Sequence, residues 1–176
     1  MQKIVFTKIS EKDFQDMEAI FGILKGWKEI YYANYGREKS NEWQAEFELK
    51  VTEDTLKIIE ILDTRYNAKF WNPTKAEAAE FYKGYNKLTL EEKSAKERSR
   101  PHKWNFDSWI DAIVNMEVAL LDLAPDGTNY VMTVEESAWP SAGIDATQHL
   151  IDIYDGEVLQ NEMIPDFDEG VRVITW

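Results

Sequence analysis

The apolar residues of this chain recur at two different spacings, and each spacing occupies its own part of the sequence. Over most of residues 10–116, apolar side chains return every three or four positions, as they do in helices that bury one face. From residue 117 onward, short β-rich runs are separated by turn residues. This order predicts an α+β fold, with helices packed on an antiparallel sheet. A length of 176 residues fits one such domain spanning residues 1–176.

The first part of the chain predicts a strand, a long helix and a second strand. Residues 2–8 form the first strand, and Ser10 followed by Asp13 is typical of a capped helix start. The apolar spacing continues this helix to about Gly36, which can close it in a left-handed conformation. Polar and apolar residues then alternate strictly over 42–51, which predicts a strand with one wet face and one buried face.

Four further helices are predicted in the middle of the chain. Thr52 caps a helix that reaches about Tyr66, and residues 68–71 are a candidate for another short strand. Thr74 and Thr89 each begin a helix, because a glutamate follows each of them three positions later. The second of these two helices is polar almost throughout and ends before Pro101. Another apolar helix begins at residue 105 or 107.

The last third predicts a sheet. Asp126-Gly127 is a strong turn signal, so residues 117–123 should pair with residues 128–135 as a hairpin. Asp155-Gly156 favours a second hairpin within 148–159, although the apolar positions there also fit a short helix. Residues 166–170 read as a loop, and residues 171–176 as a closing strand.

The charge of the chain is unevenly distributed. The net charge is −13, from 33 acidic and 20 basic residues. Residues 1–103 hold 18 acidic and 19 basic side chains, which gives +1, whereas residues 104–176 hold 15 acidic side chains and Arg172, which gives −14. Such an acidic region repels nucleic acid and anionic membranes, and it attracts a basic protein. We therefore expect no direct nucleic-acid or membrane partner.

A basic stretch precedes the acidic region. Its cations are interleaved with glutamates, which is typical of a solvated helical surface with pairs three or four residues apart. Pairing with the acidic region of a second copy is an alternative reading. The cations are Lys75, Lys83, Lys87, Lys93, Lys96, Arg98, Arg100 and Lys103.

Motifs for catalysis, metals or cofactors were sought among the reactive residue types. The chain has no cysteine, its eight glycines form no phosphate cradle, and His102 and His149 lie in no catalytic motif. The acidic loop at 166–170 lacks the later glutamate of a calcium loop. We therefore predict no catalytic residue, no cofactor and no metal.

Aromatic residues near acidic loops supply the candidate contact residues. Tryptophan is enriched at the centres of protein interfaces, and Trp139 combines an aromatic ring with neighbouring carboxylates and a following proline. The predicted partner-binding residues are Glu135, Glu136, Trp139, Asp152, Asp155 and Glu157.

These observations predict a non-enzymatic acidic binding protein. It would inhibit or neutralise a basic protein, such as a nuclease or another nucleic-acid enzyme, by placing carboxylates in its cationic groove. Immunity proteins, antitoxins and phage counter-defence proteins share this charge profile, and the comparison rests on charge alone. The alternatives are a small hydrolase-type enzyme with a carboxylate-lined cleft, or an adaptor or structural subunit of a homo-oligomer such as a homodimer. Because no leader or apolar span is evident, we expect a cytoplasmic protein.

Overall fold

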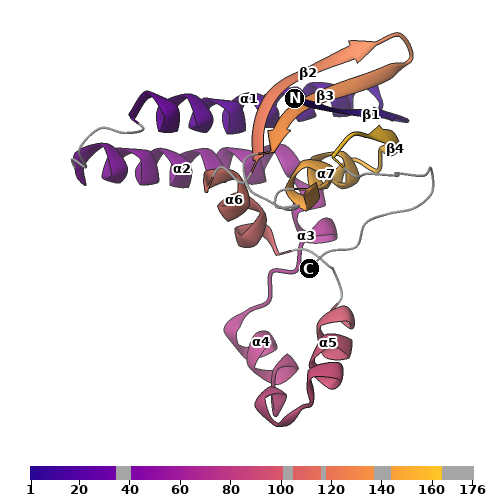
Figure 1. The fold of residues 1–176 in the computed structure, drawn as a ribbon. Coiled ribbons are helices and arrows are strands. Elements are labelled where there is room, and N and C mark those ends of the chain that lie inside the picture. Colours follow the sequence, from indigo (N-terminus) through magenta and orange to yellow (C-terminus); the bar gives the residue numbers. More distant parts are fainter. Residues whose placement is uncertain (35–40, 101–104, 116–117, 137–143, 164–176) are drawn as a thin grey trace.

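The computed structural model describes residues 1–34, 41–100, 105–115, 118–136 and 144–163. These residues form strands, α-helices and one short 3₁₀ helix, labelled η1 (Figure 1). In chain order the elements are β1 (Gln2–Thr7), α1 (Glu11–Asn34), α2 (Asn41–Leu62), α3 (Thr64–Lys69), α4 (Lys75–Phe81), η1 (Tyr85–Lys87), α5 (Leu90–Arg98), α6 (Phe106–Val114), β2 (Val118–Asp126), β3 (Asn129–Glu136), α7 (Ile144–Ile153) and β4 (Glu157–Asn161).

The strands form one antiparallel sheet in the order β2-β3-β1-β4, so the first strand of the chain lies inside the sheet. This arrangement confirms the α+β fold. It also confirms the first predicted hairpin, in which β2 pairs with β3 and Gly127 takes the positive φ of 63° that its turn requires. A register shift between Leu120 and Asp122 adds a bulge to β2, the strand at one end of this order.

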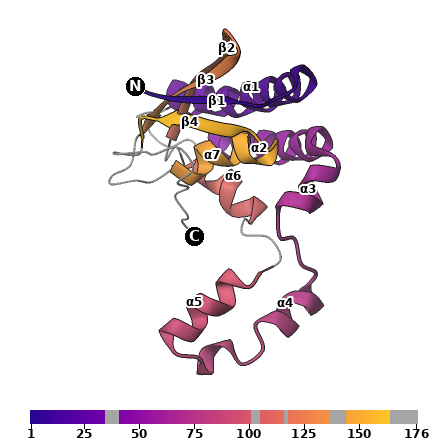
Figure 2. The same cartoon turned by 90° about the vertical axis from the view of Figure 1, so that its right-hand side faces the viewer.

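The core lies between one face of the sheet and the helices α1, α6 and α7, and the long helix α2 packs alongside α1 (Figures 1 and 2). The Asp13 backbone N–H donates to the Ser10 hydroxyl over 3.1 Å, which confirms the predicted cap of α1. The apolar face of α1 then buries six side chains. These are Phe14, Met17, Ile20, Phe21, Leu24 and Trp27.

The prediction of a strand over 42–51 was wrong, because these residues belong to α2. The buried and half-buried positions follow a helical spacing, with Phe47 and Val51 four residues apart and Ile58 further along the same side. Leu49 completed the apparent alternation but is exposed to solvent. The segment is also rich in glutamate, glutamine, alanine and lysine, which are better helix formers than strand formers.

Two smaller predictions near α2 were also wrong. Thr52 does not begin a helix: it lies inside α2, where its hydroxyl donates to the Glu48 carbonyl over 2.9 Å. Residues 68–71 are not a strand either, because α3 extends to Lys69 and only Phe70 makes an isolated bridge. Phe70 is buried against the rings of Phe106 and Trp109, so tertiary packing determines its backbone here.

The second predicted hairpin was wrong as well, and the alternative helix is correct. Residues 144–153 form α7, and Asp155 takes a left-handed φ of 57° just beyond its end. The Gly156 N–H donates to the Ile151 carbonyl over 3.1 Å, which closes the helix. The Asp-Gly pair therefore terminates a helix and leads into β4, and it does not join two strands.

Residues Trp71–Arg100, here called the arm, project from the rest of the molecule in both views (Figures 1 and 2). The arm contains α4, η1 and α5. Both of its predicted caps are confirmed: Thr74 accepts from the Glu77 N–H, and Thr89 forms a complete capping box with Glu92. The remainder of the described chain is here called the body.

Several predictions fall outside the described residues. They concern the helix end at Gly36, the break at Pro101, Trp139, the acidic loop at 166–170 and the closing strand at 171–176. Within the described ranges, none of the helices combines the length and the apolar character that crossing a bilayer requires.

Candidate interaction surface

The predicted contact residues are spread over three elements. Glu135 is exposed on β3, Asp152 is half-buried in α7, Asp155 follows the end of α7 and Glu157 begins β4. The backbone of Glu136 ends β3, and Trp139 lies outside the described residues. Asp152, Asp155 and Glu157 therefore lie together around the turn between α7 and β4, whereas Glu135 lies apart from them on the β2–β3 hairpin.

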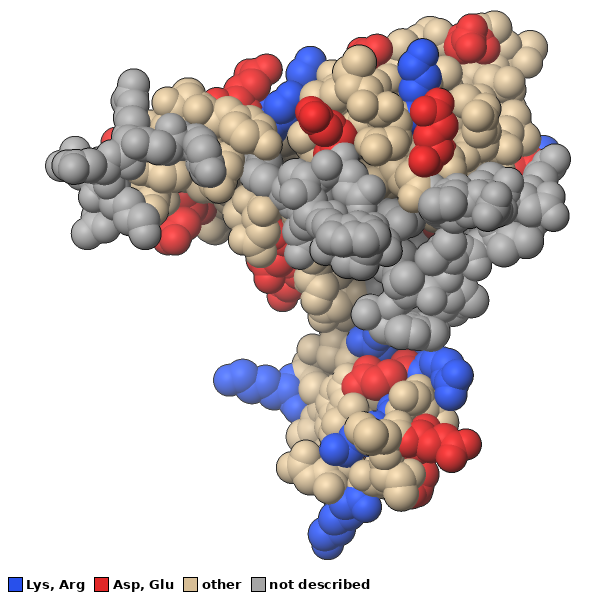
Figure 3. Space-filling view, in the orientation of Figure 1, with Lys and Arg blue, Asp and Glu red and all other residues tan. Residues whose placement is uncertain are grey.

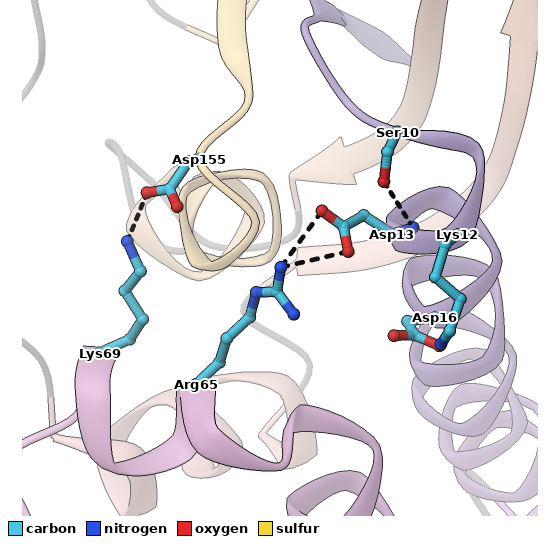
Figure 4. Close-up of polar contacts among 7 residues, drawn as sticks. All are labelled: Ser10, Lys12, Asp13, Asp16, Arg65, Lys69 and Asp155. Atoms are coloured by element: carbon cyan, nitrogen blue, oxygen red, sulfur yellow. Dashed lines mark hydrogen bonds and ion pairs between the residues drawn. The ribbon is translucent and has the colours of Figure 1, made fainter.

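The acids of the α7–β4 turn have cationic partners within the chain. Asp155 pairs with Lys69 of α3 over 2.5 Å, and Glu157 pairs with Lys8, which precedes α1, over 2.5 Å (Figure 4 shows the first pair). Ion pairs this exposed each stabilise a protein by at most about 1 kcal/mol. These ion pairs join α7 and β4 to the elements around them. A docking partner would have to displace the two lysines before it could bind these carboxylates.

A second polar contact connects α3 to the start of α1. The Arg65 guanidinium donates through Nη2 to both carboxylate oxygens of Asp13, over 3.1 and 3.2 Å (Figure 4). The same guanidinium lies 4.7 Å from the ring centre of Tyr154, at the end of α7. Lys12 pairs with Asp16 one helical turn further along α1, over 2.6 Å. Three elements, α1, α3 and the end of α7, therefore meet at a network of alternating charges.

Tyr154 is the buried member of this network. Burial raises the pKa of its phenol above the ordinary value, and the nearby carboxylates of Asp16 and Asp13 raise it further, while Arg65 opposes them. Its hydroxyl is enclosed and has no hydrogen-bond partner among the described residues. A phenol held neutral in this way has a packing role, with its ring against the guanidinium.

A groove of about 760 Å³ runs beside this network, between α1, the end of α2 and α3. Its walls carry positive and negative side chains. Among them, the carboxylates of Asp13 and Asp16 are already paired with Arg65 and Lys12. With three basic and four acidic side chains in its lining, the groove has no strong preference for an anion or a cation. Its lining residues are Lys12, Asp13, Asp16, Ile23, Lys57, Glu60, Ile61, Asp63, Thr64 and Arg65.

Several other acids in the described part of the C-terminal region have no such partner. Six exposed carboxylates, here called the unpaired carboxylates, have no lysine or arginine of the described chain within ion-pair distance. Figure 3 shows the acidic side chains of the visible face separated by uncharged residues, with cations beside some of them. The unpaired carboxylates are Asp107, Asp111, Asp122, Asp126, Glu135 and Glu162.

Three of these six lie on one hairpin. Asp122 and Asp126 are on β2, Glu135 is on β3, and together they are here called the hairpin carboxylates. On β3, Met132 and Val134 face the core, so Glu135 points to the opposite, outer face of the sheet. Sequence reasoning singled out Glu135 but not the two aspartates, although their position in the predicted hairpin already indicated exposure.

The contact between α3 and α1 could not be predicted from the sequence. The Arg65–Asp13 contact joins residues 52 positions apart, and no local pattern marks it. Among the described residues, no cluster of three metal-ligating side chains is present. His149 is half-buried within α7, and His102 lies outside the described residues.

In comparisons with known proteins, no family model, no curated protein and no solved structure matches this chain.

Proposed function

We propose that this chain is a non-enzymatic binding protein that inhibits or neutralises a basic, nucleic-acid-acting protein, and that the hairpin carboxylates make the first contact. The observation that carries the proposal is the set of unpaired carboxylates in the described part of residues 104–176. A carboxylate without an internal partner keeps its full attraction for an external cation. The region also has only one basic residue of its own, Arg172, to compete with a partner.

The proposed mechanism is occupation of the partner's substrate groove. A groove that binds phosphates presents lysine and arginine, and the hairpin carboxylates, which are spread along β2 and β3 from Asp126 at the turn to Glu135 near the other end, can occupy the phosphate positions. Long-range attraction between opposite charges raises the association rate by about 10- to 1,000-fold and fades as salt is added. The α7–β4 turn takes a smaller part, since Asp155 and Glu157 are held by lysines of the same chain.

The test begins with the full chain as bait in a host extract at low salt. Basic proteins released by a high-salt wash are identified, purified and used to measure association rates. We expect Asp122→Asn/Asp126→Asn/Glu135→Gln to slow association about tenfold or more and to flatten its salt dependence. The same bait should also lower the nuclease or nucleic-acid-binding activity of the purified partner.

The matched control removes carboxylates that are already paired, in Asp155→Asn/Glu157→Gln. Its association rate should stay within about twofold of the wild type. Equal rates for the hairpin variant and the wild type would refute the role of the hairpin. Release of no basic protein from the bait, or undiminished activity of a bound partner, would refute the function.

A further inference from the structure

The arm has no core of its own. None of the residues of Trp71–Arg100 is buried, although the segment carries four large aromatic rings. The rings contact one another at centroid distances of 5.0–5.9 Å but remain half-exposed. Leu90, the first residue of α5, is 83% exposed. Because the arm buries so little of its own apolar surface, it gains stability when another surface packs against it.

Contacts between cations and rings hold the two arm helices together. Lys96 lies 4.4 Å from the ring centre of Phe81, and Arg100 lies 5.5 Å from that of Trp71. Glu97 accepts a hydrogen bond from the Tyr82 hydroxyl over 3.3 Å. These contacts define the inner side of the arm and leave its outer side to solvent.

Four cations of the arm are exposed and have no carboxylate within ion-pair distance among the described residues. The arm as a whole holds seven basic and five acidic side chains, so its net charge is +2. In Figure 3, basic side chains extend outward from the arm into solvent. The four cations are Lys75, Lys83, Lys87 and Arg98.

The arm cannot neutralise the hairpin carboxylates of its own chain. The β2–β3 hairpin lies at one end of the molecule and the arm at the other, in both perpendicular views (Figures 1 and 2). Unpaired cations at one end and unpaired carboxylates at the opposite end are complementary only between two copies. Two copies placed antiparallel around a two-fold axis would make this contact twice.

We propose that this chain forms a reciprocal dimer in which the arm of each copy docks on the hairpin carboxylates of the other. Lys83 and Lys87, near the tip of the arm, face Asp122 and Glu135 of the second copy. The contact also covers part of the arm's solvent-exposed surface, which includes Leu90. It goes beyond the proposed function because it requires no basic partner; such a partner would compete with the arm for the hairpin.

The test uses the full chain and two charge-reversed variants. The arm variant is Lys83→Glu/Lys87→Glu, and the hairpin variant is Asp122→Lys/Glu135→Lys. Molar mass is measured by sedimentation at about 0.01 M and about 1 M salt, where the screening length falls from about 30 Å to about 3 Å. The wild type should have twice the mass of one chain at low salt, with a dissociation constant that rises about tenfold or more at high salt.

Each variant alone should be monomeric at low salt, because it places like charges across the interface. An equimolar mixture should regain the dimeric mass, since each variant supplies the charge that the other lacks. The control Lys25→Glu/Lys28→Glu makes the same charge change on α1 and should remain dimeric. Circular dichroism verifies that all four proteins are folded.

A wild type that is monomeric at both salt concentrations would overturn the dimer. A dimer that persists in either single variant, or a mixture that stays monomeric, would overturn this interface. None of these results depends on a basic protein, so the dimer and the proposed function can fail separately.

Discussion

The body and the arm both contain helices with capped starts, but they are stabilised in different ways. In the body, Trp27 and Ile58 are fully buried between α1 and α2, whereas the arm buries no residue. Both regions begin their helices with similar hydroxyl caps. The caps fix where the arm helices begin, whereas only the body has the buried core from which cooperative stability comes.

The largest expected effect is in the core of the body. Ile58→Ala removes a fully buried side chain of α2 and should lower the free energy of unfolding by about 2–5 kcal/mol. Leu56→Ala, two positions earlier and 65% exposed, should change it by less than about 0.5 kcal/mol. Urea unfolding of both variants measures the difference, and equal effects would contradict the assignment of these two faces of α2.

The next effect concerns the buried charge between α1 and α2. The Trp27 indole N–H donates to Asp54 over 2.8 Å, and Lys50 pairs with the same carboxylate over 3.0 Å. Asp54→Ala leaves the indole without its acceptor and should cost about 1–3 kcal/mol. Asp54→Asn keeps an acceptor and should cost less. Unfolding of both variants at neutral pH provides the comparison.

Acidification tests the same residue without a deletion. Burial alone would raise the pKa of Asp54, but the hydrogen bond from Trp27 and the pairing with Lys50 lower it below its ordinary value. A lowered folded-state pKa stabilises the protein above the unfolded-state value of about 3.9, and this stabilisation disappears as pH falls through the folded-state pKa. The loss of stability below about pH 4 should therefore be smaller in Asp54→Asn than in the wild type.

A similar effect is expected where α7 meets β4. A Cβ on Gly156 would lie 2.8 Å from Ile151 Cγ2 and 2.8 Å from Ile9 Cδ1, so Gly156→Ala should destabilise the body by about 1–3 kcal/mol. Gly22→Ala, within α1 and with no neighbouring atom in reach, should instead stabilise it by about 0.5–1 kcal/mol. Thermal unfolding distinguishes the two signs, and a neutral Gly156→Ala would contradict the tight turn.

The smallest global effect is expected in the arm. Thr89→Ala removes the capping box of α5, which should weaken this helix by about 1 kcal/mol and speed its amide hydrogen exchange about fivefold. The urea midpoint of the body should not change. A lower midpoint would show that the arm unfolds together with the body, and the contrast between the two regions would then be lost.

Local sequence patterns predicted some elements and misled at others, for identifiable reasons. The capped starts at Ser10, Thr74 and Thr89 depend on residues three positions apart, so the pattern and the structure agree. Alternation over 42–51 failed because it placed Leu49 on the apolar side, whereas α2 exposes this residue. Whether such a segment is a strand or a helix depends on the surface against which it packs. That surface is formed by residues far away in the sequence.

The sequence by itself determined the α+β class, the first hairpin and the excess of negative charge after residue 103. Only the tertiary structure decided which carboxylates are internally paired. Asp155 and Glu157 meet Lys69 and Lys8, whereas Glu135 has no cation of the described chain beside it. The reason is physical: a charge count depends on composition alone, but an ion pair depends on a distance of a few ångströms between residues far apart in the sequence.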